Sequence, residues 1–352
     1  MPNFTEIAIK EFSRVIEKYN ISITIDELIK RYSERHRYFH TAKHLNQIME
    51  NLASYCLSID DYDELILITM FHDIIYIPWS EQGYSEKESA NFFLNVFPIG
   101  KTYNTIRQNV YYAILNTYEH VDNTENQKLF NRLDFGFLLN TTDFAELVEY
   151  ERCIFKEYQF LDIDVYIENR INFLNSIVDK NPLIGQLINY VENREYKIGI
   201  YPGSFNPWHV GHEDILNKAE KLFDKVIVVK AINPDKDATE AAKQFELLKR
   251  QLPDREVIFV EGNIITKLFA NNVRNPHLIR GLRNGEDLIY EEKYLSLCKE
   301  YHSDLRYVMF LSNEENKDIS SSMIRNNLLT NFIVPEYATN FIVPEYAISH
   351  NI

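Results

Sequence analysis

Residues 198–212 read IGIYPGSFNPWHVGH, and this stretch decides the fold of the second half of the chain. It begins with apolar and β-branched residues, turns at Pro202 and Gly203, and reaches an amphipathic segment at about Glu213. A strand that turns sharply into a helix aims backbone N–H groups at one point, where they favour an anion. The stretch therefore predicts the first strand, loop and helix of an α/β domain, with an anion site at their junction.

The same alternation of elements continues along the chain. Short runs rich in β-branched residues, at 225–232, 256–260, 276–279 and 307–311, alternate with helix-length segments at 213–223, 238–251, 263–271 and 288–300. Alternating strands and helices favour a parallel sheet covered by helices on both faces. We expect an α/β Rossmann-like domain with a parallel five-stranded sheet at 196–330.

The first 190 residues follow a different pattern. Apolar residues recur at intervals of three and four, Gly and Pro are rare, and no sustained two-residue alternation occurs, which is typical of amphipathic helices. We expect an all-α domain at 1–190.

Residues 331–352 contain NFIVPEYA twice, at 331–338 and 340–347. Because two copies are too few for a stacked repeat, we expect a terminal tail.

Composition excludes several classes of partner. The 352 residues carry a formal net charge of −15 with scattered basic residues, so the chain is expected to be repelled by nucleic acid and by anionic membrane surfaces. Its apolar runs are far shorter than the ~20 residues that span a bilayer. The N-terminus has no apolar core of a secretory signal, so we expect a cytoplasmic protein.

The sequence HVGH at the predicted junction has a chemical rationale. His209 and His212 can donate hydrogen bonds to phosphate oxygens where charge develops during transfer. Gly211 lets a nucleotide approach the backbone closely.

This half of the chain resembles the phosphopantetheine adenylyltransferase family. The similarity continues through LFDKVIVV at 222–229, NPDK at 233–236, IRGLR at 279–283, DLIYE at 287–291 and ISSS at 319–322, in the family's order. The IRGLR and ISSS motifs separate this family from cytidylyltransferases that share HxGH.

The resemblance implies a site for each substrate. The residues expected at ATP are Ser204, Phe205, His212, Arg283, Ser320, Ser321 and Ser322. Those expected at the acceptor phosphate are Ser204, Lys236 and Arg280, and those expected to act in catalysis are His209, His212, Lys236 and Arg283. The resemblance also implies Mg²⁺ with ATP, 4′-phosphopantetheine as the acceptor, dephospho-coenzyme A and pyrophosphate as products, and a homo-oligomer, hexameric in the family.

Two departures leave the acceptor open. The family usually has Thr where His209 stands, and GTFDP where residues 203–207 read GSFNP. Adenylyltransferases acting on nicotinate or nicotinamide mononucleotide commonly have His at that position. An adenylyltransferase of NAD biosynthesis is therefore the alternative.

Histidines and carboxylates recur in order through the helical half. They lie in RYFHTAKH at 37–44, FHDIIY at 71–76, SEKESA at 85–90, NTYEH at 116–120 and LD at 133–134. Imidazoles and carboxylates converging from several helices can bind a divalent metal. The His-Asp pair falls in an expected apolar helix at 65–77, where an unpaired buried carboxylate is costly.

The ordered set is similar to the HD superfamily of metal-dependent phosphohydrolases. The resemblance implies His44, His72, Asp73 and Asp134 as ligands of Mn²⁺, Fe²⁺, Co²⁺, Ni²⁺ or Mg²⁺, and a phosphate ester or nucleotide as substrate. It places His40, Glu86 and His120 at the substrate or a second ion. Gly136 replaces the second Asp of the family's LDADL motif, and Ser85 replaces an Asn. The expectation is a bifunctional enzyme, with an inactive helical domain that senses a ligand and regulates the transferase as the alternative.

Overall fold

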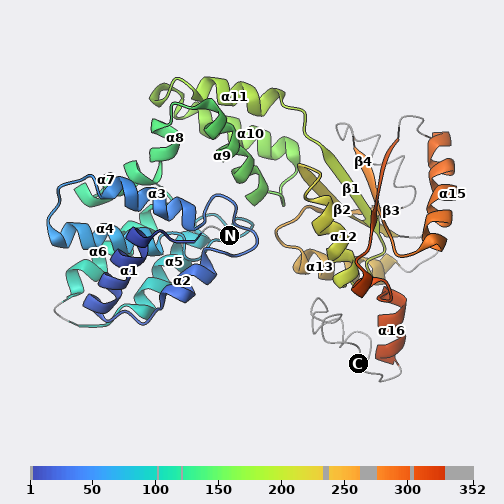
Figure 1. Ribbon diagram of the computed structural model, residues 1–352, viewed down its shortest axis with the longest axis horizontal. Coiled ribbons are helices and arrows are strands. Elements are labelled where there is room, and N and C mark those ends of the chain that lie inside the picture. The colour runs from blue at the N-terminus through green and yellow to red at the C-terminus, as the bar shows by residue number, and fades with distance from the viewer. Residues whose placement is uncertain are drawn as a thin grey trace. The chain divides into compact units, whose positions relative to one another are not determined.

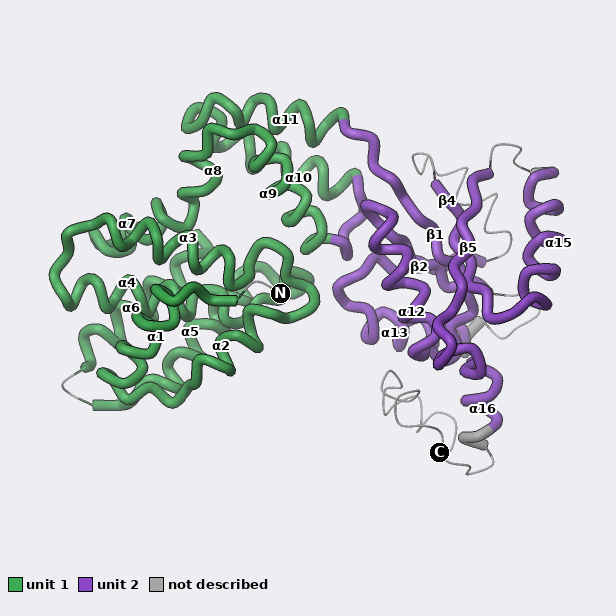
Figure 2. Tube along the Cα trace, viewed as in Figure 1, with its two compact units in different colours: residues 1–158, 164–193 green, residues 159–163, 194–352 purple. Residues whose placement is uncertain are grey.

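The computed structural model describes residues 3–100, 103–119, 122–232, 238–261, 276–301 and 305–329. Figure 2 shows the chain divided into two compact units: unit 1 is Met1–Tyr158 with Asp164–Asn193, and unit 2 is Gln159–Ile163 with Arg194–Ile352. The expected helix at 263–271, the tail at 331–352, Lys236 and His120 lie outside the described residues.

One segment falls in a different unit from the one the sequence suggested. Gln159–Ile163 lies within the predicted helical domain 1–190 but belongs to unit 2. The ammonium of Lys225 is buried and donates hydrogen bonds to the carbonyl oxygens of Gln159 and Leu161 at 2.8 and 2.6 Å. These two bonds tie the segment to the first residue of a strand in unit 2.

The described part of unit 1 is helical, as predicted (Figure 1). Its elements are α1 (Glu6–Tyr19), α2 (Ile25–Arg31), α3 (Ala42–Leu52), α4 (Ile59–Phe71), α5 (Tyr84–Val96), α6 (Asn104–Asn116), α7 (Glu125–Asp134), α8 (Gly136–Asn140), α9 (Phe144–Glu157), α10 (Ile163–Asn175), the 3₁₀ turn η2 (Val178–Lys180) and α11 (Ile184–Asn193).

Helix α4 forms the centre of unit 1. Every residue from Asp63 to Phe71 is buried, and α4 packs against α1, α3, α5, α6 and α7. Ser58 begins the helix by accepting a hydrogen bond from the backbone N–H of Asp61, as short hydroxyl side chains commonly do at this position. A second apolar cluster joins α8, α9, α10 and α11 through residues such as Leu147 and Leu187.

Unit 2 contains the predicted five-stranded parallel sheet. The strands β1 (Ile198–Gly203), β2 (Lys225–Ile232), β3 (Val257–Glu261), β4 (His277–Leu282) and β5 (Arg306–Leu311) lie in the order β3-β2-β1-β4-β5. The accompanying helical elements are α12 (Val210–Ala219), α13 (Ala238–Gln251), α15 (Gly285–Tyr301), the 3₁₀ turn η3 (Glu314–Asn316) and α16 (Ser321–Leu329).

The strand order determines where unit 2 binds ligands. From β1 the chain adds β2 and β3 on one side of the sheet and then β4 and β5 on the other, so the switch point lies between β1 and β4. Parallel sheets of this kind bind ligands at the carboxyl ends of the strands at the switch point. Helix α12 contacts β4 and β5. A Cβ atom on Gly281 would lie 2.8 Å from Ile215 of α12, so glycine lets the helix approach this strand closely.

Within the described ranges, no helix combines the length and the apolar composition that crossing a membrane requires.

Candidate functional site

A cavity of about 350 Å³ lies at the carboxyl ends of β1 and β4 in unit 2. Of the residues that the sequence predicted for nucleotidyl transfer, it is lined by Ser204, Phe205, His209, His212, Arg280, Arg283, Ser320 and Ser321. Ser322 is not part of this lining. Segments that are more than 100 residues apart in the sequence thus meet at the predicted anion site.

His209 and His212 form a stacked pair where α12 begins. Their ring centroids lie 3.7 Å apart, with the ring planes inclined by 25°. His209 is the N-cap of α12, and its Nδ1 accepts a hydrogen bond from the backbone N–H of Gly211 at 3.1 Å. A Cβ atom at position 211 would lie 3.1 Å from the His209 ring, so glycine keeps the pair close to the backbone.

Burial favours the neutral form of both imidazoles. Burial lowers the pKa of His209 to about 4, and the charge of Arg283 acts in the same direction. Burial also holds the pKa of His212 well below its usual range, helped by His209, Lys230 and Arg283. In the described chain, His212 Nδ1 is buried without a hydrogen-bond partner. Because a neutral imidazole has one donor and one acceptor, His212 can bind a ligand oxygen.

Carboxylates of α15 orient two arginines in the cavity. Glu291 Oε1 accepts hydrogen bonds from Arg280 Nε and Nη2 at 2.8 and 2.6 Å. Asp287 binds the guanidinium of Arg283 through both of its oxygens at 3.0 Å. Because these carboxylates fix its orientation, each planar guanidinium is positioned to bind a phosphate.

The ISSS turn adds hydroxyl groups and a helix N-terminus. Ser321 begins α16, and its hydroxyl donates to the carbonyl oxygen of Pro207 at 2.9 Å. Ser320 Oγ accepts from the backbone N–H of Met323 at 3.1 Å. Ser322 instead accepts from Arg325 Nη2 at 3.1 Å. The turn thus packs on the loop after β1, and the N-terminus of α16 favours an anion beside it.

Sequence reasoning missed two cations that hold the loop after β1. Lys230 is buried in β2, and its ammonium donates to the carbonyl oxygen of Ser204 and to Gln244 Oε1. Arg325 donates to the carbonyl oxygen of Asn206. The signal for Lys230 was present, since it is the only charged side chain in the apolar run 226–232.

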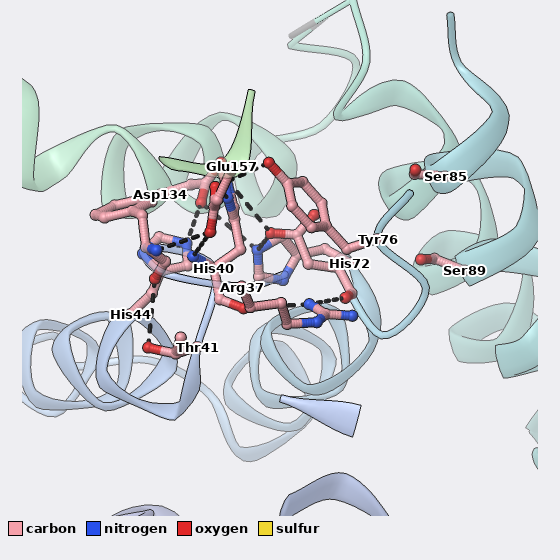
Figure 3. Close-up of polar contacts among 12 residues, drawn as sticks. Arg37, His40, Thr41, His44, His72, Tyr76, Ser85, Ser89, Asp134 and Glu157 are labelled. Carbon is pink, nitrogen blue, oxygen red and sulfur yellow. Dashed lines mark hydrogen bonds and ion pairs between the residues drawn. The ribbon is translucent and has the colours of Figure 1, made fainter. Parts of the chain in front are cut away.

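A second cluster of functional groups lies in unit 1. Potential ligand atoms of His44, His72 and Asp134 all lie within 4.8 Å of one another (Figure 3). Asp134 Oδ1 is 2.9 Å from His44 Nε2 and 3.6 Å from His72 Nε2. Asp73 completes the predicted set, because its Oδ2 lies 3.0 Å from His72 Nε2. The structure therefore brings all four predicted metal ligands together.

This donor set fits a divalent transition metal. His72 Nδ1 lies 3.1 Å from the carbonyl oxygen of Thr69, which leaves Nε2 facing the carboxylates. That Nε2 is buried and makes no well-formed hydrogen bond within the described residues. Metal-binding histidines commonly hold their second nitrogen in this way, and mixed imidazole and carboxylate ligands suit Mn²⁺, Fe²⁺, Co²⁺ and Ni²⁺.

The titratable groups of the cluster are strongly coupled. Burial opposes protonation of His72, but the adjacent Asp73 outweighs it and raises the pKa of His72 to about 9. Burial likewise opposes ionisation of Asp73, yet the neighbouring His72 and His40 hold its pKa below its ordinary value. A metal cation bound among these groups would balance the charge of the carboxylates in place of the protons on the imidazoles.

His40 and Glu86 lie beside the cluster. His40 Nε2 is 4.0 Å from Asp73 Oδ2. Burial raises the pKa of Glu86, and the negative charge of Asp73 contributes. The sequence placed His40 and His44 one helical turn apart, but Thr41 is the N-cap of α3, so His40 precedes the helix.

The His-Asp pair lies at a helix end rather than inside the expected helix 65–77. Helix α4 stops at Phe71 and His72 is its C-cap. The backbone N–H groups of Ile75 and Ile77, which a continuing helix would bond to the carbonyl oxygens of Phe71 and Asp73, instead donate to Ser89 Oγ and Ser85 Oγ at 3.1 and 2.9 Å. The buried guanidinium of Arg37 donates to the carbonyl oxygens of Asp73 and Ile74 at 2.8 and 3.2 Å and holds this segment in place.

The replacement at Gly136 leaves the cluster complete. Asp134, at the end of α7, is the carboxylate that meets His44 and His72. Gly136 begins α8. A cavity of about 600 Å³ adjoins the cluster, and His44, Asp134, Lys43, Arg132, Phe39, Phe137 and Tyr150 are among its lining residues.

Comparison with known proteins identifies the class of unit 2. Residues 200–327 match the family model described as cytidylyltransferase-like. With the reversed parallel sheet, the cavity at its switch point and the paired histidines, this match defines unit 2 as a cytidylyltransferase-like nucleotidyltransferase domain.

Sequence relatives identify the particular family. A phosphopantetheine adenylyltransferase of Mycoplasma mycoides is 40% identical over 133 residues, which are 37% of this chain and 94% of the relative. One from Leuconostoc mesenteroides is 36% identical over 132 residues, which cover 36% of this chain and 80% of that one. The chain belongs to the phosphopantetheine adenylyltransferase family.

Two solved structures are also similar. A putative nicotinate-nucleotide adenylyltransferase from Vibrio parahaemolyticus matches with a TM-score of 0.32 and 16% identity, over 44% of this chain and 95% of its own. A bifunctional NMN adenylyltransferase/ADP ribose pyrophosphatase from Francisella tularensis matches with a TM-score of 0.29 and 13% identity, over 41% and 44% of the two chains.

Proposed function

We propose that unit 2 transfers the adenylyl group of ATP to 4′-phosphopantetheine, forming dephospho-coenzyme A and pyrophosphate. The observation that carries this proposal is the single cavity lined by the stacked histidines, Arg280, Arg283 and Ser321. Such a set positions a triphosphate and neutralises its charge, which is most of what in-line phosphoryl chemistry requires.

Each group has a role in this reaction. His212 donates a hydrogen bond to an oxygen of the ATP α-phosphate, where charge grows as the acceptor phosphate attacks. Arg283 and the turn formed by Ser320 and Ser321 bind the departing pyrophosphate, and Mg²⁺ accompanies ATP. Arg280, with Lys236, binds the acceptor phosphate. The acceptor oxygen forms a bond to the α-phosphorus as the bond to pyrophosphate breaks, so no covalent enzyme intermediate is needed.

The identity of the acceptor is the point to test. His209 is the residue that favours the alternative, a nicotinate or nicotinamide mononucleotide adenylyltransferase. Pyrophosphate release should be measured with ATP and each acceptor in turn, at matched concentrations. Turnover with 4′-phosphopantetheine that exceeds turnover with both mononucleotides supports the proposal, and the reverse order refutes it.

We also propose that unit 1 is a metal-dependent phosphohydrolase of the HD type. The convergence of His44, His72, Asp73 and Asp134 supports it, since these residues supply imidazole and carboxylate ligands in one place. A bound divalent metal would supply an acidified water and a charge on the phosphate. The adjoining cavity, with Lys43 and Arg132 among aromatic side chains, has room for a phosphate ester or nucleotide.

A metal assay separates this activity from the alternative of an inactive regulatory sensor. The full chain should be purified, loaded with Mn²⁺ and assayed with p-nitrophenyl phosphate and bis(p-nitrophenyl) phosphate. Bound metal with turnover that a chelator abolishes supports hydrolysis. A chain that holds metal but turns over neither ester, while metal changes the transferase rate, supports the sensor.

The assembly of the chain also belongs to the proposal. Family resemblance implies a homo-oligomer, hexameric through unit 2. Light scattering on the purified chain tests this, and a monomer at micromolar concentration would contradict it.

A further inference from the structure

A buried carboxylate outside the predicted ligand set faces the unit 1 cluster. Glu157 is the last residue of α9, and its side chain is fully buried. Its Oε1 accepts hydrogen bonds from the backbone N–H groups of Tyr38, Phe39 and His40 at 2.7, 2.7 and 3.0 Å. These three bonds fix the turn that leads into α3.

The second oxygen of Glu157 meets two side chains. His40 Nδ1 lies 2.6 Å from Oε2, and the hydroxyl of Tyr76 donates to the same oxygen at 2.9 Å. Because an ionised carboxylate only accepts hydrogen bonds, the proton between Glu157 and His40 lies on Nδ1. The other ring nitrogen, Nε2, is therefore turned away from Glu157.

Packing fixes the plane of the His40 ring as well. The ring lies against that of Tyr76 with centroids 4.4 Å apart, and it meets the edge of Phe39 at 5.1 Å. Its Nε2 faces Asp73 at 4.0 Å, too far for a direct hydrogen bond. The His40 side chain stays 22% exposed, whereas the side chain of His72 is 2% exposed. The His40 side chain is therefore less enclosed than that of His72.

We propose that Glu157 is a positioning residue that holds the proton of His40 on Nδ1, so that the unprotonated Nε2 can accept a proton from the water that attacks a phosphate bound beside Asp73. This inference rests on the proposed hydrolase function. Positioning of an imidazole by a carboxylate that binds its far nitrogen is an established device in catalytic sites. Nothing in the order of the HD-type motifs assigns this residue.

The substitution Glu157→Gln isolates the effect on His40. The amide oxygen of Gln can replace Oε1 and keep the three backbone hydrogen bonds. The amide nitrogen would replace Oε2, and because it only donates, it would force His40 Nδ1 to become an acceptor. The proton would then move to Nε2 while the turn at residues 38–40 stays in place. Glu157→Ala would lose both the three backbone hydrogen bonds and the contact with His40, so it is the less informative variant.

The first measurement reads the proton directly and needs neither metal nor turnover. Nitrogen-15 NMR of the imidazoles in the full, metal-free chain distinguishes protonated from unprotonated Nδ1, with His40→Asn used to assign the resonance. We expect His40 Nδ1 to be protonated in the natural chain and unprotonated in Glu157→Gln, but unchanged in Glu168→Gln, which alters an exposed carboxylate of α10. A protonated Nδ1 in both chains would overturn the inference.

The second measurement uses Mn²⁺-dependent hydrolysis of bis(p-nitrophenyl) phosphate. We expect Glu157→Gln to lower kcat about tenfold with bound Mn²⁺ unchanged, because an Nε2 that carries the proton can no longer accept one from the attacking water. The double variant with His40→Asn should be no slower than His40→Asn alone. Multiplicative losses would show that Glu157 does not act through His40. If the natural chain binds no Mn²⁺ or shows no turnover, the proposed hydrolase activity is refuted. The NMR result would still decide whether Glu157 positions His40.

Discussion

The imidazole ring of His212 stacks on that of His209, with 3.7 Å between the ring centroids. His209 is fixed by the backbone of α12, so it holds the second ring in place. Burial lowers the pKa of both rings and so favours their neutral forms. The pair therefore offers hydrogen bonds to phosphate without adding a positive charge to a cavity that already contains two arginines.

The first prediction concerns His212. His212→Ala removes a donor that acts as charge grows on the α-phosphate, so turnover should fall about a hundredfold, equivalent to about 3 kcal/mol. His212→Asn keeps an N–H donor and should recover part of the loss. Steady-state pyrophosphate release measures both variants. Near-normal turnover of the Ala variant would exclude His212 from the reaction.

The second prediction separates the two substrate pockets. Arg280→Met alone would leave Glu291 buried without its guanidinium partner, so it should be combined with Glu291→Gln and compared with Glu291→Gln alone. We expect the double variant to raise the KM of the acceptor more than that of ATP. Arg283→Ala, at a side chain that is 41% exposed, should raise the KM of ATP instead. The opposite pattern would show that the pockets are exchanged.

The third prediction concerns Lys230. Its ammonium binds the carbonyl oxygen of Ser204, so Lys230→Met should loosen the loop after β1 and raise the KM of ATP several-fold. Lys230→Met leaves the carbonyl oxygen of Ser204 and the amide oxygen of Gln244 without their donor, which costs about 1–3 kcal/mol, so the variant should melt below the natural chain and its KM should be measured well below that temperature. Lys221→Met, at an exposed position in unit 2, is the control. An unchanged KM would mean that Lys230 serves only the fold.

The local part of the fold could be predicted from the sequence. The strand and the helix of the β1–α12 corner are encoded within 198–212, but the turn expected at Pro202 and Gly203 lies further along, because β1 continues through Gly203 and α12 begins at Val210. The positions of Arg280 and Arg283 could be predicted in the same way, since both residues lie at the carboxyl end of a predicted strand next to the switch point. These features depend on neighbours along the chain and on the general topology of parallel sheets.

Features that depend on distant partners could not be predicted. The segment after α4 is held by Arg37, which donates to the carbonyl oxygen of Asp73 from 36 residues away. The orientation of His40 depends on Glu157, which is 117 residues away. Nothing in FKEYQF at 155–160 distinguishes that glutamate from an exposed one on an amphipathic helix. Such tertiary contacts override local pattern, so they appear only once the helices are packed.

The fourth prediction concerns metal binding. Asp134→Asn removes the carboxylate shared by His44 and His72, so bound Mn²⁺ should fall from about one equivalent to near zero. Mn²⁺ at 100 times its dissociation constant should stabilise the natural chain by about 2.7 kcal/mol and should not stabilise the variant. Elemental analysis and thermal melting measure these effects. Glu125→Gln, at an exposed position of the same helix, should behave as the natural chain does. Equal Mn²⁺ in all three would exclude Asp134 as a ligand.

The fifth prediction concerns a buried charge in unit 1. The side chain of Asp63 is fully buried in α4 and binds Arg14 Nη2 at 2.7 Å, Lys18 Nζ at 2.5 Å and the Tyr19 hydroxyl at 2.9 Å. Burial opposes its ionisation, but the hydrogen bonds from Arg14, Lys18 and Tyr19 prevail and lower its pKa. Breaking a buried pair costs ~3–5 kcal/mol, but both cations are about one-third exposed, so Asp63→Asn should cost about 2 kcal/mol at pH 7.

The pH dependence of that loss has a defined sign. Because the pKa of Asp63 is lower in the folded chain, its contribution to stability is complete above the unfolded value of ~3.9 and is lost as pH falls through the folded value. The deficit of Asp63→Asn in urea unfolding should therefore be constant from pH 7 to about 5 and should shrink below about 4. Asp60→Asn, at an 88% exposed side chain 4.0 Å from Lys18, should change stability by less than about 0.5 kcal/mol throughout. A deficit for Asp63→Asn that does not diminish in acid would show that the loss comes from packing rather than from the charge.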